Sequence, residues 1–171
     1  MSRVAVLIGV LALLSGSAAV AQAPPAPPAP DYAVIRMSID VGRPAEAAWA
    51  RVGKFCDLGA WFKIDCVITK GDGDIGSIRA LVGGRIVEVM VAKTPLSYGY
   101  VQPPVAGRAY DLYHGFLEAR PVSATSSRLL YTLMYDVSLL PDQAARDADI
   151  AKRRAQFEGA LKAMKAIAER P

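Results

Sequence analysis

The stretch SIRALVGGRIVEVMVAK, residues 77–93, contains two runs of apolar and β-branched residues on either side of a Gly-Gly pair. Apolar and polar side chains roughly alternate in both runs, which is typical of half-buried strands. Because Gly83 and Gly84 provide a tight connection, the two runs are expected to pair as an antiparallel hairpin. This hairpin predicts a sheet of antiparallel strands.

The same period of about two residues extends on both sides of this hairpin. Further strand candidates are YAVIRMSIDV (32–41), CVITK (66–70), LSYGYVQ (96–102), AYDLYHGFLEARPV (109–122) and SRLLYTLMYDV (127–137). Short segments rich in Gly, Pro, Asp and Ser separate most of them, and such segments form turns. The sequence therefore predicts an antiparallel sheet of about six to seven strands.

Helical patterns lie before and after the main run of strands. Residues 44–52 begin with proline and continue with good helix formers, and a second short helical turn is expected through Trp61. A long helix is predicted from Asp142 to about Glu169. Its apolar stripe consists of Ile150, Phe157, Leu161, Met164 and Ala168. Helices segregated from an antiparallel sheet indicate an α+β domain.

The first residues of the chain have the features of an export signal. Arg3 precedes a short apolar core, and Ala19-Val20-Ala21 matches the small-residue pattern of a cleavage site. We therefore expect a signal peptide over residues 1–21, cut after Ala21, a Pro-rich linker over 22–31 and a single domain over 32–170. The apolar core is shorter than the roughly 20 residues that a stable membrane span needs. The mature protein is expected to be periplasmic or secreted.

The two cysteines, Cys56 and Cys66, are ten positions apart in FCDLGAWFKIDC. This spacing allows redox chemistry, metal binding, a nucleophilic thiol or a disulfide, but it is not the C-x-x-C of a dithiol enzyme. Because exported proteins meet an oxidising environment, we expect a Cys56–Cys66 disulfide.

Other motifs and the overall charge predict no metal, cofactor or nucleic acid. Residues 71–76 spell G-x-G-x-x-G, but a strand rather than a helix is expected to follow, so a turn is predicted instead of a nucleotide loop. His114 is the single histidine, and strand alternation places it on the face opposite Tyr113. The net charge of +4 falls to +3 without Arg3, which is too small to indicate nucleic-acid binding.

Several short motifs resemble the START/birch-pollen-allergen/polyketide-cyclase (SRPBCC) superfamily, and its polyketide cyclase/dehydrase-like branch in particular. They are Trp49, Phe55 and Trp61, then residues 76–79 (GSIR), 84–88 (GRIVE), 97–98 (SY), 113–115 (YHG), 127–128 (SR) and 135–136 (YD). The resemblance extends over residues 33–168 and implies a helix-grip fold, in which the sheet curls around the long C-terminal helix and encloses a cavity.

The resemblance also implies which side chains face the cavity. Arg79 and Glu88 would either orient a ligand or position a proton transfer, or else form a structural cross-strand ion pair. The other candidate ligand-binding residues are Met90, Tyr98, Tyr113, Tyr131, Leu133, Tyr135, Phe157, Leu161 and Met164. The run from Lys152 to Arg154 is expected to be a solvated helix face.

The expected function is the binding or carriage of an apolar or aromatic small molecule, such as a lipid, an isoprenoid or a polyketide-like compound. The first alternative is a polyketide cyclase/dehydratase-like enzyme that uses the cavity Arg, Glu and Tyr side chains. The second is a non-catalytic accessory protein that binds a partner. Since the fold hosts carriers, receptors and enzymes alike, the site must decide between them, and the oligomeric state stays open.

Overall fold

The computed structural model describes residues 29–108 and 110–171, which form one seven-stranded antiparallel sheet and three helices. The elements are β1 (Tyr32–Val41), α1 (Ala45–Val52), α2 (Leu58–Phe62), β2 (Cys66–Lys70), β3 (Ile78–Leu81), β4 (Ile86–Thr94), β5 (Ser97–Gln102), β6 (Tyr113–Ser123), β7 (Ser126–Asp136) and α3 (Gln143–Ala168). The predicted signal peptide and most of the linker lie outside the described residues.

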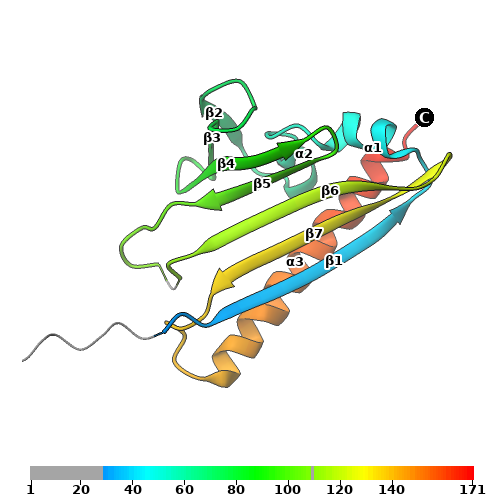
Figure 1. Ribbon diagram of the computed structural model, residues 1–171. Helices are drawn as coiled ribbons and strands as arrows, with labels where there is room; N and C mark the ends of the chain where they lie inside the picture. Colours follow the sequence, from blue (N-terminus) through cyan, green and yellow to red (C-terminus); the bar gives the residue numbers. More distant parts are fainter. Residues whose placement is uncertain (1–28, 109) are drawn as a thin grey trace, which may run out of the picture.

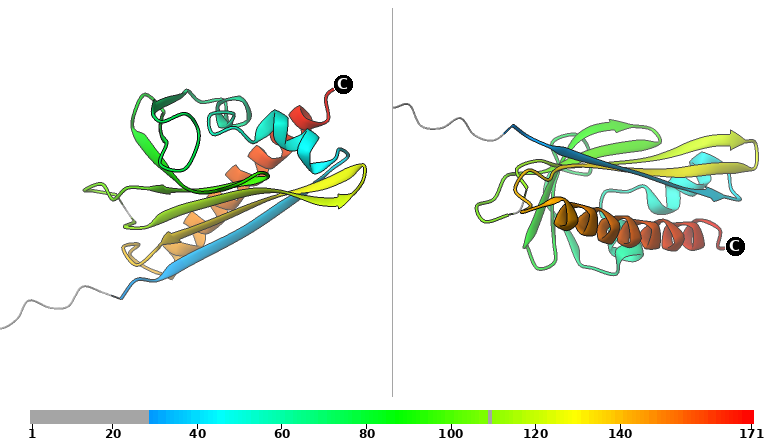
Figure 2. Two further views of the ribbon diagram at one scale, coloured as in Figure 1. Left: turned by 45° about the horizontal axis from the view of Figure 1, so that its top comes forward. Right: turned by 90° about the horizontal axis from the view of Figure 1, so that it is seen from below.

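Strands β2 to β7 follow one another as a meander, and β1 pairs with β7 at the far edge, which gives the order β1-β7-β6-β5-β4-β3-β2. Helix α3 runs along one face of the sheet and packs on β1, β7, α1 and α2 (Figures 1 and 2). The predicted α+β architecture, with a long C-terminal helix against a twisted antiparallel sheet, is confirmed. No helix within the described ranges is long and apolar enough to cross a membrane.

The hairpin of residues 77–93 forms as predicted, with Arg79 opposite Glu88 in the β3–β4 register. Val82, Gly83 and Gly84 all have positive φ in its turn. Two of these positions have glycine, which adopts this conformation at no steric cost. Val82 is β-branched and costs about 1–2 kcal/mol there. The turn is thus tight and partly strained, and it lies beside a pocket described below.

Specific contacts fix the ends of the helices. Helix α1 ends at Gly53, where the Trp49 ring packs so close to the backbone that a Cβ would lie only 2.3 Å from it. Helix α3 begins where the Asp142 carboxylate accepts a hydrogen bond from the Ala145 backbone N–H at 2.8 Å. At its other end the Glu169 carboxylate accepts from the Gly42 N–H at 2.7 Å. The long helix is therefore tied to the β1–α1 connection.

One element boundary differs from expectation. Strand β6 begins at Tyr113 rather than near residue 109. The Tyr110 side chain is instead held by a hydrogen bond from its hydroxyl to Gln102 Oε1 at 2.8 Å.

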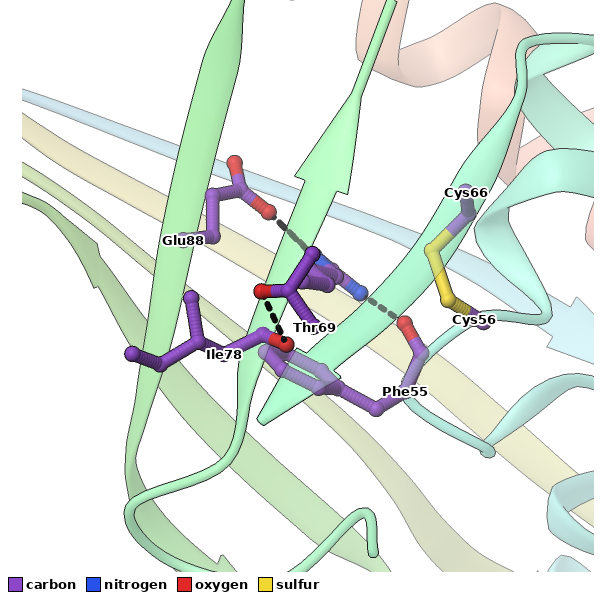
Figure 3. The surroundings of a disulfide bond; sticks show 7 residues. Phe55, Cys56, Cys66, Thr69, Ile78 and Glu88 are labelled. Atoms are coloured by element: carbon purple, nitrogen blue, oxygen red, sulfur yellow. Dashed lines mark hydrogen bonds and ion pairs between the residues drawn. A yellow bond between two sulfur atoms is a disulfide. The ribbon is translucent and has the colours of Figure 1, made fainter. Parts of the chain in front are cut away.

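The predicted Cys56–Cys66 disulfide is confirmed, with the two Cα atoms 5.5 Å apart (Figure 3). It closes a loop that contains all of α2. Within this loop the Phe62 ring packs on Phe157 of α3, with ring centroids 5.0 Å apart. The disulfide therefore holds α2 in place against the long helix and fits an oxidising compartment.

Replacing both cysteines by serine is expected to lower the free energy of unfolding by roughly 2–3 kcal/mol, because a ten-residue crosslink restricts the unfolded chain. Thermal unfolding of the Cys56→Ser/Cys66→Ser variant should show a Tm lower by roughly 5–12 °C. A Tm unchanged from that of the oxidised wild type would contradict this role.

Candidate functional site

A pocket of about 270 Å³ lies between α2, α3 and the inner face of strands β3 to β7; we call it the α3 pocket. Its wall consists of Leu58, Phe62, Ile64, Leu81, Val82, Ile86, Glu88, Tyr100, Gln102, Tyr110, Tyr113, Tyr131, Arg153, Gln156 and Phe157. The side chains from α2, the residues after it and the β3–β4 hairpin are mainly apolar, whereas those from β5, the β5–β6 connection and α3 are mainly polar or aromatic. The pocket is therefore amphipathic.

Behind this pocket, Arg79 is fully buried and spans the space between two strands and the disulfide loop. Its Nε donates a hydrogen bond to Glu88 Oε2 at 2.7 Å, and a second guanidinium nitrogen lies 2.6 Å from the same oxygen. Its third nitrogen donates to the Phe55 carbonyl, the residue before Cys56 (Figure 3). The guanidinium also lies over the Phe55 and Tyr100 rings, 4.1 and 4.9 Å from their centroids.

These contacts keep Arg79 charged in spite of its burial. Burial opposes the charge, but the nearby Tyr98 and Glu88 favour it, and the pKa of Arg79 lies above its ordinary value. Since its three nitrogens already have partners, Arg79 fixes the position of Glu88 and of the disulfide loop. A buried guanidinium without these partners would be strongly unfavourable.

The polar contacts continue from Glu88 towards the pocket opening. Glu88 Oε1 accepts a hydrogen bond from Gln102 Nε2 at 2.9 Å. The Gln102 Oε1 atom accepts from the Tyr110 hydroxyl and from Arg108, at 2.8 and 2.6 Å. Both Glu88 and Gln102 line the pocket. The side-chain oxygens of Glu88 and Gln102 already accept hydrogen bonds, so these residues form an ordered polar end of the pocket rather than a set of free groups.

Two tyrosines form the floor of the pocket. The hydroxyls of Tyr100 on β5 and Tyr131 on β7 are 2.9 Å apart and hydrogen-bond to each other. Tyr100 crosses the strand between them at Gly115, where a Cβ would lie 2.2 Å from its ring. A glycine within a strand often marks such a close approach. Gly115 is thus required for Tyr100 to reach Tyr131.

Arg153 of α3 is half-buried at the pocket opening, with 20% of its side chain exposed. Its Nε donates to Asp149 Oδ2 at 2.7 Å, one turn earlier on the same helix. Its guanidinium carbon lies over three aromatic rings, 4.4 Å from the Tyr135 centroid, 5.2 Å from Tyr113 and 5.4 Å from Tyr110. The expectation of a solvated face at residues 152–154 is therefore wrong for Arg153, because the tyrosine rings give its planar group a surface to stack on.

A second pocket of about 600 Å³, here called the α1 pocket, lies between the end of α1, the following loop and the β4–β5 hairpin. Trp49, Phe55, Met90 and Tyr98 provide its apolar wall, and Lys54, Asp57 and Lys93 are among its polar residues. Phe55 and Arg79, with the Tyr98 and Tyr100 rings beside them, separate the two pockets. The space between the sheet and the helices is thus divided rather than continuous.

This architecture is shared with solved structures of very different sequence. The aromatase/cyclase ZhuI from a Streptomyces species superposes with a TM-score of 0.66 at 17% identity, over 82% of this chain and 95% of its own. Ara h 8.0201 gives a TM-score of 0.60 at 14% identity, over 81% and 98% of the two chains. A solution structure from Thermobifida fusca gives 0.65 at 22%, over 77% and 90%.

The chain has the helix-grip fold. No family model matches its sequence, and no curated protein matches it either. At these identities the similarity establishes the fold, and the activity has to be argued from the site. Among the described residues, no group of three or more His, Cys, Asp or Glu side chains is placed to hold a metal ion.

The residues singled out in the sequence fall into four places in this helix-grip domain. Glu88, Tyr113, Tyr131 and Phe157 line the α3 pocket. Met90 and Tyr98 line the α1 pocket. Leu133, Tyr135, Leu161 and Met164 are buried in the core and line neither pocket. Arg79 lines neither pocket and is buried between them.

Sequence reasoning missed Tyr100, Gln102 and Arg153 as pocket residues, although each had a signal. Tyr100 and Gln102 are two and four residues after Tyr98, so they share its side of the strand. Arg153 is four residues before Phe157 and therefore lies on the same helix face. The signal for the α2 side of the pocket was the predicted disulfide, which was expected to hold Trp61 and Phe62 near the cavity.

Breaking the buried ion pair from one side is expected to destabilise the fold strongly. Arg79→Met leaves Glu88 buried without a counter-charge, and the free energy of unfolding should fall by about 3–5 kcal/mol in urea denaturation. The double variant Arg79→Met/Glu88→Met should recover a large part of this loss, because two apolar side chains replace two charges.

The matched control is Arg128→Met, which removes an exposed ion pair with Asp40. It should leave the free energy of unfolding nearly unchanged. If Arg79→Met is as stable as this control, Arg79 does not support the fold in the way described here.

Alkaline pH is expected to destabilise the protein through its buried tyrosines. Burial raises the pKa of Tyr98, Tyr100, Tyr113, Tyr131 and Tyr135 above the ordinary value. In the unfolded chain they ionise near pH 10. The folded state therefore binds more protons than the unfolded state above about pH 10, and the free energy of unfolding must fall as the pH rises further.

Ultraviolet absorbance of tyrosinate measures this directly. In the folded protein these five tyrosines should stay protonated above about pH 10 and ionise together with loss of structure. Reversible titration of all seven tyrosines near pH 10 with the fold intact would contradict their burial.

Proposed function

We propose that the protein binds a compact hydrophobic molecule in the α3 pocket. The observation that carries this proposal is the pocket itself, a concave site with an apolar wall and a small set of ordered polar groups at one end. This combination is typical of small-molecule sites. The domain of residues 32–170 would act after export, in the periplasm or outside the cell, with residues 1–21 removed as a signal peptide.

The size of the pocket narrows the class of ligand. Sites for drug-sized molecules usually measure about 300–1,000 Å³, and the α3 pocket measures about 270 Å³. It therefore suits a molecule of up to about three rings, or a short branched chain, better than a full-length lipid. The ring faces of Phe62, Tyr113 and Phe157 favour an aromatic or polyketide-like body.

The expected affinity is moderate. Burial of an aromatic group about the size of a Trp side chain removes about 150–250 Å² from water. At about 25 cal/mol per Å² this contributes about 4–6 kcal/mol. Without further polar contacts, the dissociation constant would lie between tens of micromolar and about one millimolar. Tighter binding requires the polar end of the pocket.

The neutral fluorescent probe N-phenylnaphthylamine tests the proposal. It should bind saturably, and Ile86→Trp should weaken its binding about ten-fold or more, because the larger side chain fills the pocket next to Val82. The matched control is Ile75→Trp, an identical change at a side chain that is 60% exposed in the β2–β3 connection and lines neither pocket. Equal affinity of the Ile86→Trp variant, the control and the wild type would place the site elsewhere.

A second candidate function is catalysis of a cyclisation or dehydration. The specific observation in its favour is that the Glu88 carboxylate and the Tyr100 hydroxyl line the same pocket, where a proton could be exchanged with a bound carbonyl compound. ZhuI, named an aromatase/cyclase, has the same fold. Loss of water from a short linear polyketone in the presence of the wild type, but not of Glu88→Gln, is the expected result. Recovery of the unchanged compound would contradict catalysis.

A further inference from the structure

We infer that the α3 pocket selects ligands with an anionic group, such as an aromatic carboxylate, and that Arg153 is the residue that binds this group. The inference rests on the proposed function of the pocket and specifies the class of its ligand. It depends on where Arg153 lies, how it is held and which donors it has left.

Arg153 is held by contacts that leave its two terminal nitrogens without a charged partner. Asp149 engages the Nε, and the guanidinium lies over the rings of Tyr110, Tyr113 and Tyr135. An arginine stacked on aromatic faces keeps the N–H groups at its edge available for a planar acceptor. Its Nε donates to Asp149, and its other N–H groups lie within reach of the Tyr113 and Tyr135 hydroxyls. A neutral hydroxyl is a weaker acceptor than a carboxylate, so a ligand carboxylate can take its place at the two terminal nitrogens.

The charges around the pocket also favour an anion. Arg153 is balanced by Asp149, and Glu88 is balanced by Arg79. Arg108, bound to Gln102 and Tyr110, adds a further cation at the same end of the pocket. The surroundings of the pocket thus hold three guanidinium groups, of Arg79, Arg108 and Arg153, and two carboxylates, of Glu88 and Asp149. A ligand carboxylate would complete this set, whereas a ligand cation would leave the pocket with excess positive charge.

The distribution of polar and apolar residues in the pocket wall indicates where the charged group and the ring of a ligand would lie. Arg153 and Gln156 lie one helical turn apart at the polar, partly open side. Leu58, Phe62 and Ile64 form the apolar side. A molecule with its ring between α2 and the β3–β4 hairpin would therefore place a carboxylate at Arg153, in a bidentate geometry that arginine favours.

Competition against N-phenylnaphthylamine with the pair naphthoate and naphthamide tests this inference, because the two differ in charge but hardly in shape. The wild type should bind naphthoate about ten-fold or more tightly than naphthamide, which is the usual effect of a hydrogen bond to a charged group. Arg153→Met should remove this preference while changing naphthamide affinity less than about three-fold. Arg153→Lys should retain part of it, since the charge remains without the planar fork.

The matched control is Arg154→Met on the same helix. The Arg154 side chain is 45% exposed and does not line the pocket, so the preference for naphthoate should persist. Equal binding of both compounds by the wild type, failure of naphthoate to displace the probe, or a preference that survives in Arg153→Met overturns the inference and leaves the proposed function standing. If the probe itself does not bind the wild type, or binds it and Ile86→Trp equally, the proposed function fails together with the inference.

Discussion

The buried contact between Arg79 and Glu88 connects the parts of the protein on which the site depends. It joins β3 to β4, and through the Phe55 carbonyl it joins both strands to the loop that the disulfide closes. A buried ion pair contributes little net stability compared with apolar packing, but each charge requires the other to be in place. The pair therefore acts chiefly as a positional constraint, and both pockets are arranged around it.

The division of the interior follows from this constraint. In a helix-grip fold the sheet and the long helix leave space between them, and here Arg79, Phe55 and the neighbouring tyrosine rings occupy its middle. Towards the C-terminal half of α3 the space is filled by Leu161 and Met164. What remains on the other side is the compact α3 pocket. A site of this size and polarity favours a small amphipathic molecule over a long acyl chain.

Much of the fold could be predicted from the sequence because its signals are local. Alternation in the strands, the Gly83-Gly84 turn and the apolar stripe of the last helix each specify an element without reference to the rest of the chain. The disulfide was predictable because the expected export signal implied an oxidising compartment. The resemblance of short motifs then supplied the topology.

The site was less predictable, because cavity lining depends on how elements meet. Leu133 and Tyr131 lie on the same face of β7, yet Tyr131 reaches the pocket and Leu133 lies in the filled core. The charge run at residues 152–154 suggested solvent exposure, and the tyrosines that cover Arg153 come from strands and loops distant in sequence. Glu88 was identified from its sequence motif. Its hydrogen-bond partner Gln102 depends on how β4 pairs with β5, and this pairing contains an irregularity that the sequence does not reveal.

The most direct test of the central claim is a crystal structure of the protein with N-phenylnaphthylamine bound. We expect ligand density between α2, α3 and the β3–β4 hairpin, in contact with Phe62 and Phe157, with the Arg79–Glu88 contact unchanged. Density in the α1 pocket beside Trp49, or an α3 pocket that collapses when the probe binds elsewhere, would contradict it.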